Sequence, residues 1–297
     1  MASSAGLDHA EACAQALDAT VVALLGDPAT ARRIVERALT LVDPLESRSV
    51  AVFARRALGM AAVAEGDYDT AYTQFRSAFT DDGDPVHYHV SYTLLAELAA
   101  AAVRRGRQEH AAELLERSAR RLGTGMSARV RTLIDRGRAL LADPEHAEPF
   151  FRAALKEPAG EQWPFERAQT QLDYGEWLRR QRRIAEARPL LSAALEVFQR
   201  LGARPWVERA QAELRAAGIE AGDVVPTAFA ELSPQQQQIV QLAARGLTNR
   251  EIGEKLFLSP RTVGSHLYRV FPKLGITARS QLRDVVEGIL SGTGVQG

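Results

Sequence analysis

Residues Leu247–Gly275 read LTNREIGEKLFLSPRTVGSHLYRVFPKLG, and their capping residues predict two short helices joined by a turn. Thr248 and Glu251 have the Thr-x-x-Glu spacing of a capping box, in which each side chain pairs with a free amide of the first helical turn. Ser259 and Pro260 mark the start of the second helix. A serine before the helix can accept a hydrogen bond from a free amide of the first turn, and a proline at the first position lacks an N–H that would have no partner there in any case. The stretch therefore predicts helix, turn, helix.

The second of these helices has two chemically different faces. One face is an apolar stripe at helical spacing, made of Val263, Leu267, Val270, Phe271 and Leu274. The opposite face offers hydrogen-bonding groups and positive charge without a carboxylate, from Arg261, Gly264, Ser265, Tyr268 and Arg269. From Pro260 to Phe271 such a helix is about 18 Å long and can lie across a DNA major groove. Its first-turn amides, together with Thr262, can bind a phosphate.

The segment Leu232–Leu282 resembles the DNA-binding domain of LuxR/FixJ-type bacterial transcription regulators. The matching positions are Leu232-Ser233-Pro234, Ala244, Gly246 to Ile252, Ser259-Pro260, Thr262-Val263, His266, Lys273 to Ile276 and Arg279. So many fixed spacings over about fifty positions make the resemblance specific. The resemblance implies four helices, with the first near Pro234–Ala244, a scaffold helix near Asn249–Leu256, a recognition helix near Pro260–Leu274 and a dimerisation helix near Ala278–Leu290.

The resemblance also implies roles for single residues. The positions that would face base edges are Gly264, Ser265 and Tyr268. The positions that would contact the DNA backbone or support the domain are Thr248, Asn249, Arg250, Arg261, Thr262, His266, Arg269 and Lys273. The implied partner is double-stranded promoter DNA bound by a homodimer, with RNA polymerase as a further partner.

Three residues depart from the family pattern. Gln236 stands where glutamate is usual, so an expected ion pair inside the domain is lost. Gly264 replaces a common lysine, which removes a base or phosphate contact and lowers helix propensity by about 1 kcal/mol. Pro272 lies inside the recognition helix and is expected to kink its last turn. These departures affect base readout rather than the fold.

The first two-thirds of the chain predict helices in a repeating frame. Alanine, leucine, arginine and glutamate dominate there, which favours helix throughout. A small–large–small frame recurs at Ala31-Val35-Ala38, Ala71-Phe75-Ala78, Ala111-Leu115-Ser118, Ala147-Phe151-Ala154 and Ala187-Leu191-Ala194. The small residue lets two antiparallel helices approach closely, and the frame resembles tetratricopeptide (TPR) repeats. A last helix near Trp206–Ala217 is expected to cap the array.

Prolines and histidines in this region have simple interpretations. Pro149 and Pro189 share a repeat position and fit only if both lie in the first turn of their helices. His87 and His89 suggest a metal pair, but if Pro85 opens a helix, residues two apart point to different sides. We therefore expect surface histidines rather than metal ligands.

The chain is predicted to be all-α, with a TPR-like helical repeat solenoid followed by a four-helix LuxR-type helix-turn-helix domain. Periodicity is lost around Gly222 and Pro226, where a linker is expected. The predicted divisions are 1–218 for the repeats, 219–230 for the linker, 231–290 for the helix-turn-helix domain and 291–297 for a flexible tail.

Composition narrows the classes of function. The chain is formally neutral, but residues 231–290 hold eight Lys/Arg against five Asp/Glu, an excess of +3. This modest excess predicts weak non-specific DNA affinity and a need for dimerisation. Cys13 alone cannot form an intrachain disulfide, and the sequence has neither a long apolar run nor a signal peptide, so we expect a cytoplasmic protein without membrane contact.

The whole arrangement resembles the C-terminal part of large ATP-binding LuxR regulators. No Gly-x4-Gly-Lys-Ser/Thr loop is present, so their ATPase activity is not implied. No nucleophile–base pair or paired-carboxylate site emerges, so neither an enzyme nor a cofactor is expected. We predict a transcription regulator, an activator, whose repeats bind a peptide, protein or small-molecule effector; the repeats could equally serve only as a dimerisation or spacing scaffold. The alternative is an interaction adaptor whose C-terminal bundle only dimerises.

Overall fold

A computed structural model describes residues 2–218, 232–256, 258–274, 276 and 278–282 of the 297-residue chain. These residues form helices and no β-strand, which confirms the all-α prediction. No helix in this part of the chain combines the length and apolar character that a bilayer span requires. The chain divides into two compact units, Met1–Ala217 and Gly218–Gly297, which we call the array and the C-terminal unit. The predicted linker and tail, and most of the predicted dimerisation helix, lie outside the described residues.

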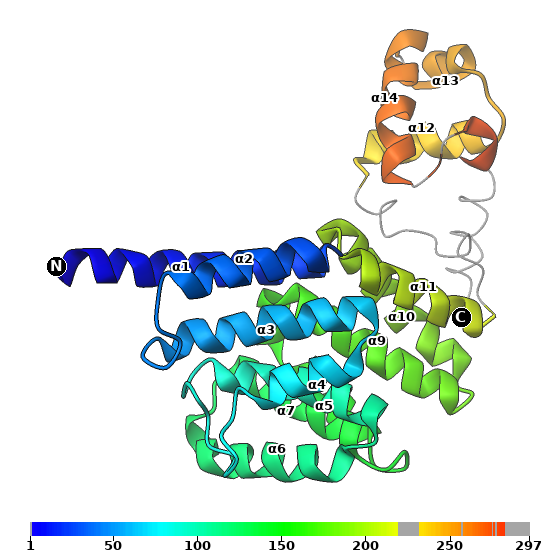
Figure 1. The fold of residues 1–297 in the computed structure, drawn as a ribbon. Coiled ribbons are helices and arrows are strands. Elements are labelled where there is room, and N and C mark those ends of the chain that lie inside the picture. Colours follow the sequence, from blue (N-terminus) through cyan, green and yellow to red (C-terminus); the bar gives the residue numbers. More distant parts are fainter. Residues whose placement is uncertain (1, 219–231, 257, 275, 277, 283–297) are drawn as a thin grey trace. The chain divides into compact units, whose positions relative to one another are not determined.

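The array is built from helices that pack against their neighbours in the chain (Figure 1). The helices are α1 Ala2–Leu24, α2 Pro28–Thr40, α3 Arg48–Glu65, α4 Tyr68–Arg76, α5 Leu95–Arg105, α6 Gln108–Leu122, α7 Ala128–Leu141, α8 Glu148–Lys156, α9 Pro164–Arg180, α10 Ile184–Leu201 and α11 Arg204–Ala216. Most successive helices are joined by short connections, and a longer one, which contains the 3₁₀ helix Ser91–Leu94, joins α4 and α5.

The predicted repeat frame forms the contact between paired helices. Its fifteen positions lie in or next to α2, α4, α6, α8 and α10, and each is at most 4% exposed. Glycines on the facing helices allow the close approach, since a Cβ at Gly59 would stand 2.3 Å from Phe75 and one at Gly175 would stand 2.6 Å from Leu191. This packing is compatible with TPR-like repeats.

The first and last parts of the array meet (Figure 1). The Nε of Arg204, at the start of α11, donates to the backbone oxygen of Leu25 at 2.9 Å. A Cβ at Gly26 would stand 3.3 Å from the Pro205 ring. The connection between α1 and α2 therefore packs on the first turn of α11. Helix α11 also covers α10 through buried residues that include Trp206, as expected of a cap.

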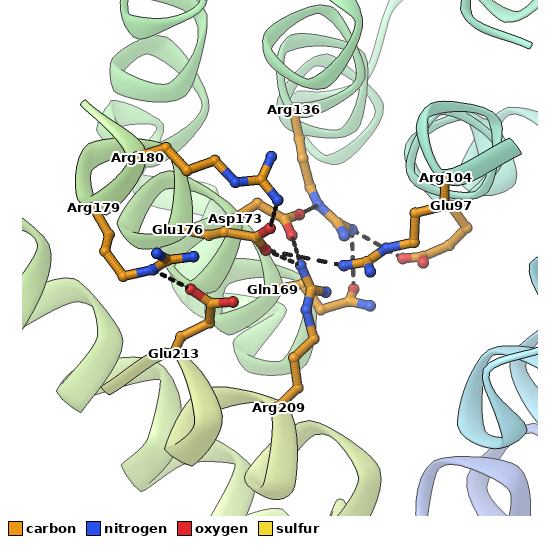
Figure 2. A network of polar contacts seen from close by, with 10 residues as sticks. All are labelled: Glu97, Arg104, Arg136, Gln169, Asp173, Glu176, Arg179, Arg180, Arg209 and Glu213. Atoms are coloured by element: carbon orange, nitrogen blue, oxygen red, sulfur yellow. Dashed lines mark hydrogen bonds and ion pairs between the residues drawn. The ribbon is translucent and has the colours of Figure 1, made fainter. Parts of the chain in front are cut away.

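Buried arginine–carboxylate contacts join four helices inside the array (Figure 2). Arg136 of α7 is 1% exposed; its Nε donates to Asp173 of α9 at 2.8 Å, and its Nη1 donates to Glu97 of α5 at 2.9 Å and to Gln169 of α9 at 3.1 Å. Arg209 of α11 donates to the other oxygen of Asp173 at 2.8 Å. Burial raises the pKa of Asp173, but these two guanidinium groups outweigh it and hold that pKa below its ordinary value.

The two prolines of the repeat frame do not occupy equivalent turns. Pro149 lies in the first turn of α8 as expected, but Pro189 lies inside α10, which begins five residues earlier at Ile184. The expectation for Pro189 is therefore wrong. Pro189 is exposed on its helix, so the carbonyl that loses its partner one turn earlier can bind water instead.

The segment around His87 is not the start of a helix. Pro85 instead forms an isolated bridge with Phe79, so the condition that Pro85 opens a helix is not met. The Nδ1 of His87 accepts from the backbone N–H of His89 and of Val90, both at 3.3 Å. The His87 ring nitrogen therefore caps the turn by accepting two backbone hydrogen bonds.

The C-terminal unit folds around one small core. Its described helices are α12 Pro234–Ala244, α13 Asn249–Leu256 and α14 Pro260–Lys273, followed by the 3₁₀ turn η5 Arg279–Gln281. The first three match the predicted ranges to within one residue. The buried core is formed by Leu232, Ile239, Val240, Ala243, Ile252, Val263, Leu267, Val270, Leu274, Ile276 and Leu282.

Candidate nucleic-acid interface

The entry to α13 is fixed by the predicted capping box. Gly246 has a φ of +88° and ends the preceding helix. The backbone N–H and the hydroxyl of Thr248 both donate to Glu251 Oε2 at 2.7 Å, and the Glu251 N–H donates back to Thr248 Oγ at 3.3 Å. These bonds from Thr248 hold the pKa of Glu251 below its ordinary value. The capping prediction is confirmed.

The turn between α13 and α14 depends on Gly253. This residue is buried, and a Cβ added to it would stand 2.4 Å from the backbone oxygen of Leu258. The Leu258 N–H also donates to the Gly253 oxygen at 2.9 Å. Only glycine allows the two backbones to approach so closely, so this position sets how α14 is placed against α13.

Helix α14 begins at its predicted cap and buries its predicted stripe. Ser259 Oγ accepts from the Thr262 N–H at 3.0 Å, and the two hydroxyls lie 2.7 Å apart. Within the stripe, Phe271 is half-buried and the other four side chains are at most 4% exposed. The helix packs on α12 and α13 through this stripe and is about 21 Å long.

The exposed face of α14 holds most of the residues predicted to read DNA. Arg261, Ser265, Tyr268 and Arg269 are exposed, and the Tyr268 side chain is 81% exposed. The Ser265 hydroxyl donates to the Arg261 backbone oxygen at 3.0 Å, so its oxygen can still accept a hydrogen bond. Lys273 continues the exposed cationic surface at the end of the helix.

Gly264 lies at the edge of this face, beside the start of α13. A Cβ on Gly264 would stand 3.4 Å from Asn249 Nδ2. The Asn249 Oδ1 accepts from Arg279 Nη1 at 2.5 Å, and Arg279 also donates to the Leu247 backbone oxygen. Arg279 therefore holds Asn249 in place and ties η5 to the start of α13.

The remaining predicted positions are mostly engaged within the domain. Arg250 donates to Glu254 at 3.1 Å on the surface of α13. Thr248 and Thr262 are used in the two caps described above. His266 is half-buried, and among the described residues its buried Nδ1 has no hydrogen-bond partner. The exposed cations of α14 without an ion pair in the described residues are Arg261, Arg269 and Lys273.

Three residues have roles that the sequence interpretation missed. Gly253 lies inside a predicted helix, and a glycine there was the available signal for a close backbone approach. Arg279 was matched to the family pattern by its position, and no contact was predicted for it. Gln236 keeps the cap of α12 despite its departure from glutamate, because its Oε1 accepts from the Ser233 N–H at 3.1 Å while Ser233 Oγ accepts from the Gln236 N–H at 3.3 Å.

This arrangement is suited to a DNA duplex. A supported helix presents hydroxyl and phenol groups at the centre of its exposed face and cations around them. Hydroxyl groups can read base edges in a major groove, and cations attract phosphates on either side. The capped N-terminus of α14 adds the positive end of a helix dipole.

Comparisons with known proteins agree with this geometry. Residues 230–286 match the family described as bacterial regulatory proteins, luxR family. Over 56 residues, 19% of its length, this chain is 45% identical to the candidate HTH-type transcriptional regulators Mb0914c of Mycobacterium bovis and Rv0890c of Mycobacterium tuberculosis. Over 54 residues, 18% of this chain, it is 41% identical to the oxygen regulatory protein NreC of Staphylococcus aureus.

The family match, residues 230–286, lies within the C-terminal unit. The aligned regions span 6% of the length of the mycobacterial relatives and 25% of NreC. A search of solved structures found no match to the chain. The helix order, the caps and the family match point to the same assignment. The C-terminal unit is a helix-turn-helix domain of the luxR family of bacterial regulatory proteins.

Proposed function

We propose that the protein is a sequence-specific transcription regulator that binds double-stranded promoter DNA through α14. The observation that carries the proposal is the exposed face of α14, where Ser265 and Tyr268 are flanked by Arg261 and Arg269 and the apolar stripe is buried on the opposite side. The modest positive charge of residues 231–290 favours binding as a homodimer, because two copies double the phosphate contacts.

The repeats supply the regulatory input in this proposal. Stacked helical repeats present extended surfaces that bind peptides, proteins or small molecules. The effector then controls DNA occupancy or the recruitment of RNA polymerase, and we favour activation over repression. No catalytic step is part of this proposal.

An electrophoretic mobility-shift assay on the full chain tests DNA binding. We expect binding to a fragment from upstream of its own gene that survives excess competitor DNA and weakens as salt is raised. Arg269→Ala should weaken binding to all sequences and lower the slope of log affinity against log salt by about 1. Absence of binding at any ionic strength would instead favour an interaction adaptor whose C-terminal unit only dimerises.

Base readout is tested separately from phosphate contact. Ser265→Ala and Tyr268→Phe remove hydrogen-bonding groups from the centre of the face without removing charge. We expect them to change which sequences are preferred, by about 1–3 kcal/mol at the affected base pairs, while random-sequence affinity stays near that of wild type. If the serine, tyrosine and arginine variants all lowered specific and random binding equally, the assignment of the reading face would be wrong.

A further inference from the structure

The array contains an open cavity of about 300 Å³ where its first and last parts meet. The cavity lies beside the contact between Arg204 and Leu25 that joins the two ends. Most of its wall is apolar. Its lining comes from the end of α1 (Val21, Leu24), from α3 and α7 (Arg56, Arg129), from the start of α9 and the residue before it (Glu166, Trp163) and from the end of α10 (Leu201).

The mouth of the cavity gathers apolar side chains that the fold leaves partly uncovered. Val21 is 52% exposed, Leu25 39%, Trp163 38% and Leu201 40%. These four come from three separate parts of the array, yet all line the same cavity. Scattered apolar residues on a surface need no explanation, but a cluster around one opening is typical of a binding site.

The inner end of the cavity is lined by charged side chains, among which the arginines outnumber the carboxylates. Arg129 takes both oxygens of Glu166, with Nε–Oε2 at 3.0 Å and Nη2–Oε1 at 2.5 Å, and its guanidinium lies 3.8 Å from the centre of the Trp163 ring. Arg56 reaches Glu166 only at 3.5 Å, and its buried Nε has no hydrogen-bond partner among the described residues. The charged residues of the lining are two arginines and one glutamate, so one positive charge is in excess.

The surroundings of Arg56 favour an additional anion. Burial lowers the pKa of the Arg56 guanidinium, and Glu166 offsets this only in part. The first turn of α9 also lines the cavity, and its cap residue Trp163 makes no side-chain hydrogen bond to the turn. Its amides and the helix dipole therefore add positive potential at the same end.

We propose that this cavity binds a small monocarboxylate with an apolar body. The carboxylate lies against Arg56 and the first turn of α9, and the body lies against Val21, Leu24 and Leu201. One excess positive charge matches a monoanion, and a volume of about 300 Å³ is at the lower end of the range for small-molecule pockets. This assignment rests on the proposed function, for which it names the chemical class of the effector.

Calorimetric titration of the full chain tests the assignment. The probes are straight-chain and phenyl-substituted monocarboxylates of six to ten carbons, each compared with the corresponding primary alcohol. We expect one site per chain for at least one carboxylate, and binding of the matching alcohol at least tenfold weaker, since a charge-assisted hydrogen bond is lost. Equal affinity of acid and alcohol, or no binding by any acid, overturns the proposal.

Two variants and two matched controls locate the site. Arg56→Gln should weaken carboxylate binding at least tenfold without changing alcohol binding. Leu201→Gln, at a partly exposed position where the fold should tolerate it, should weaken acid and alcohol alike by about tenfold. The controls are Arg152→Gln and Leu45→Gln, whose side chains are exposed outside the cavity lining, and both should bind as wild type. If Leu201→Gln and wild type bound a carboxylate equally, the acid would occupy another site and the proposal would be wrong.

A failure of the carboxylate proposal can be distinguished from a failure of the proposed function. Calorimetry without DNA reports the cavity alone, and the mobility-shift assay without carboxylate reports α14 alone. DNA binding without carboxylate binding overturns the effector class and leaves the regulator. Carboxylate binding without DNA binding supports the cavity and overturns the regulator.

Discussion

The array and the C-terminal unit use arginine in opposite ways. In the array, Arg136 is 1% exposed and pairs with Glu97 and Asp173 on two other helices. In the described part of the C-terminal unit, the ion pair is Arg250–Glu254, whose side chains are 83% and 65% exposed on a single helix. Arg136 therefore fixes the arrangement of helices in the array, whereas Arg261 and Arg269 of α14 are exposed and remain available to a ligand.

This difference has an energetic consequence. Breaking a buried pair leaves an uncompensated charge in a poorly solvated place, which is strongly destabilising. Breaking an exposed pair costs little, because water and salt already screen it. The same substitution should therefore have very different effects on the stability of the two units.

The largest effect is expected for Arg136→Ala. This change leaves Glu97 and Asp173 buried without their shared cation and should destabilise the array by about 3–5 kcal/mol. Urea unfolding followed by circular dichroism measures the loss, with Arg152→Ala as the control because Arg152 pairs with Glu148 at an exposed position. A loss below about 1 kcal/mol for Arg136→Ala would remove the contrast between the two units.

A smaller effect is expected at the helical glycines of the C-terminal unit. Gly253→Ala should destabilise this unit by about 1–3 kcal/mol, because the new Cβ would meet the Leu258 oxygen at 2.4 Å. Gly264→Ala provides the matched control, since its Cβ would make an ordinary contact at 3.4 Å from Asn249 and helix propensity would improve by up to about 1 kcal/mol. Thermal unfolding should give changes of opposite sign, and the same sign for both would contradict the role of Gly253.

Local chemistry explains what the sequence predicted well. The bounds of α13 and α14 depend on Thr248, Glu251 and Ser259, whose partners lie three residues away. The repeat frame was equally accessible, because a small residue followed by a large one four positions later records the contact between paired helices. Predictions succeeded where the deciding sequence pattern lies within a few residues along the chain.

Contacts between distant residues explain what the sequence could not predict. Arg136 meets partners 33 to 39 residues away, and nothing near it distinguishes a buried arginine from a solvated one. The cavity likewise needs Val21 and Leu201, which come together only when the array closes. Pro189 was misplaced because the start of α10 depends on the preceding turn, where Arg182 has a φ of +60°. The base-facing assignments at Ser265 and Tyr268 stay predictions.

Lowering the pH should reduce the stability of the array, because Glu148 becomes protonated. This carboxylate accepts from Arg183 at 2.6 and 3.0 Å, and from Arg152 and Tyr174, so its pKa falls to about 2. Because the folded pKa lies below the unfolded value of about 4.3, the stabilisation is fully present above that value and is lost as pH falls toward 2. Glu148→Gln should cost on the order of 1–2 kcal/mol at pH 6.

The measurement for Glu148 is unfolding at a series of pH values. The difference between wild type and Glu148→Gln should shrink as pH falls from about 4.5 to about 2. Glu186 is a useful comparison because it also accepts from Arg183 but is 53% exposed, so Glu186→Gln should change stability less. A constant difference between wild type and Glu148→Gln across this range would show that packing, not charge, is what the substitution removes.

The smallest effect on stability is expected for Arg250→Ala. Its pair with Glu254 spans one turn of an exposed helix surface, where such pairs contribute about 0.3–0.5 kcal/mol. We expect a larger effect on DNA: if Arg250 contacts a phosphate, its loss weakens binding to every sequence and lowers the salt slope by about 1. Glu254→Ala is the matched control: it removes the same pair but leaves the cation, so stability should fall equally while DNA affinity holds or rises. If the two variants weakened DNA binding alike, Arg250 would act by supporting α13 rather than by contacting phosphate. Arg250 would then belong with the arginines that stabilise the fold, not with those that face a ligand.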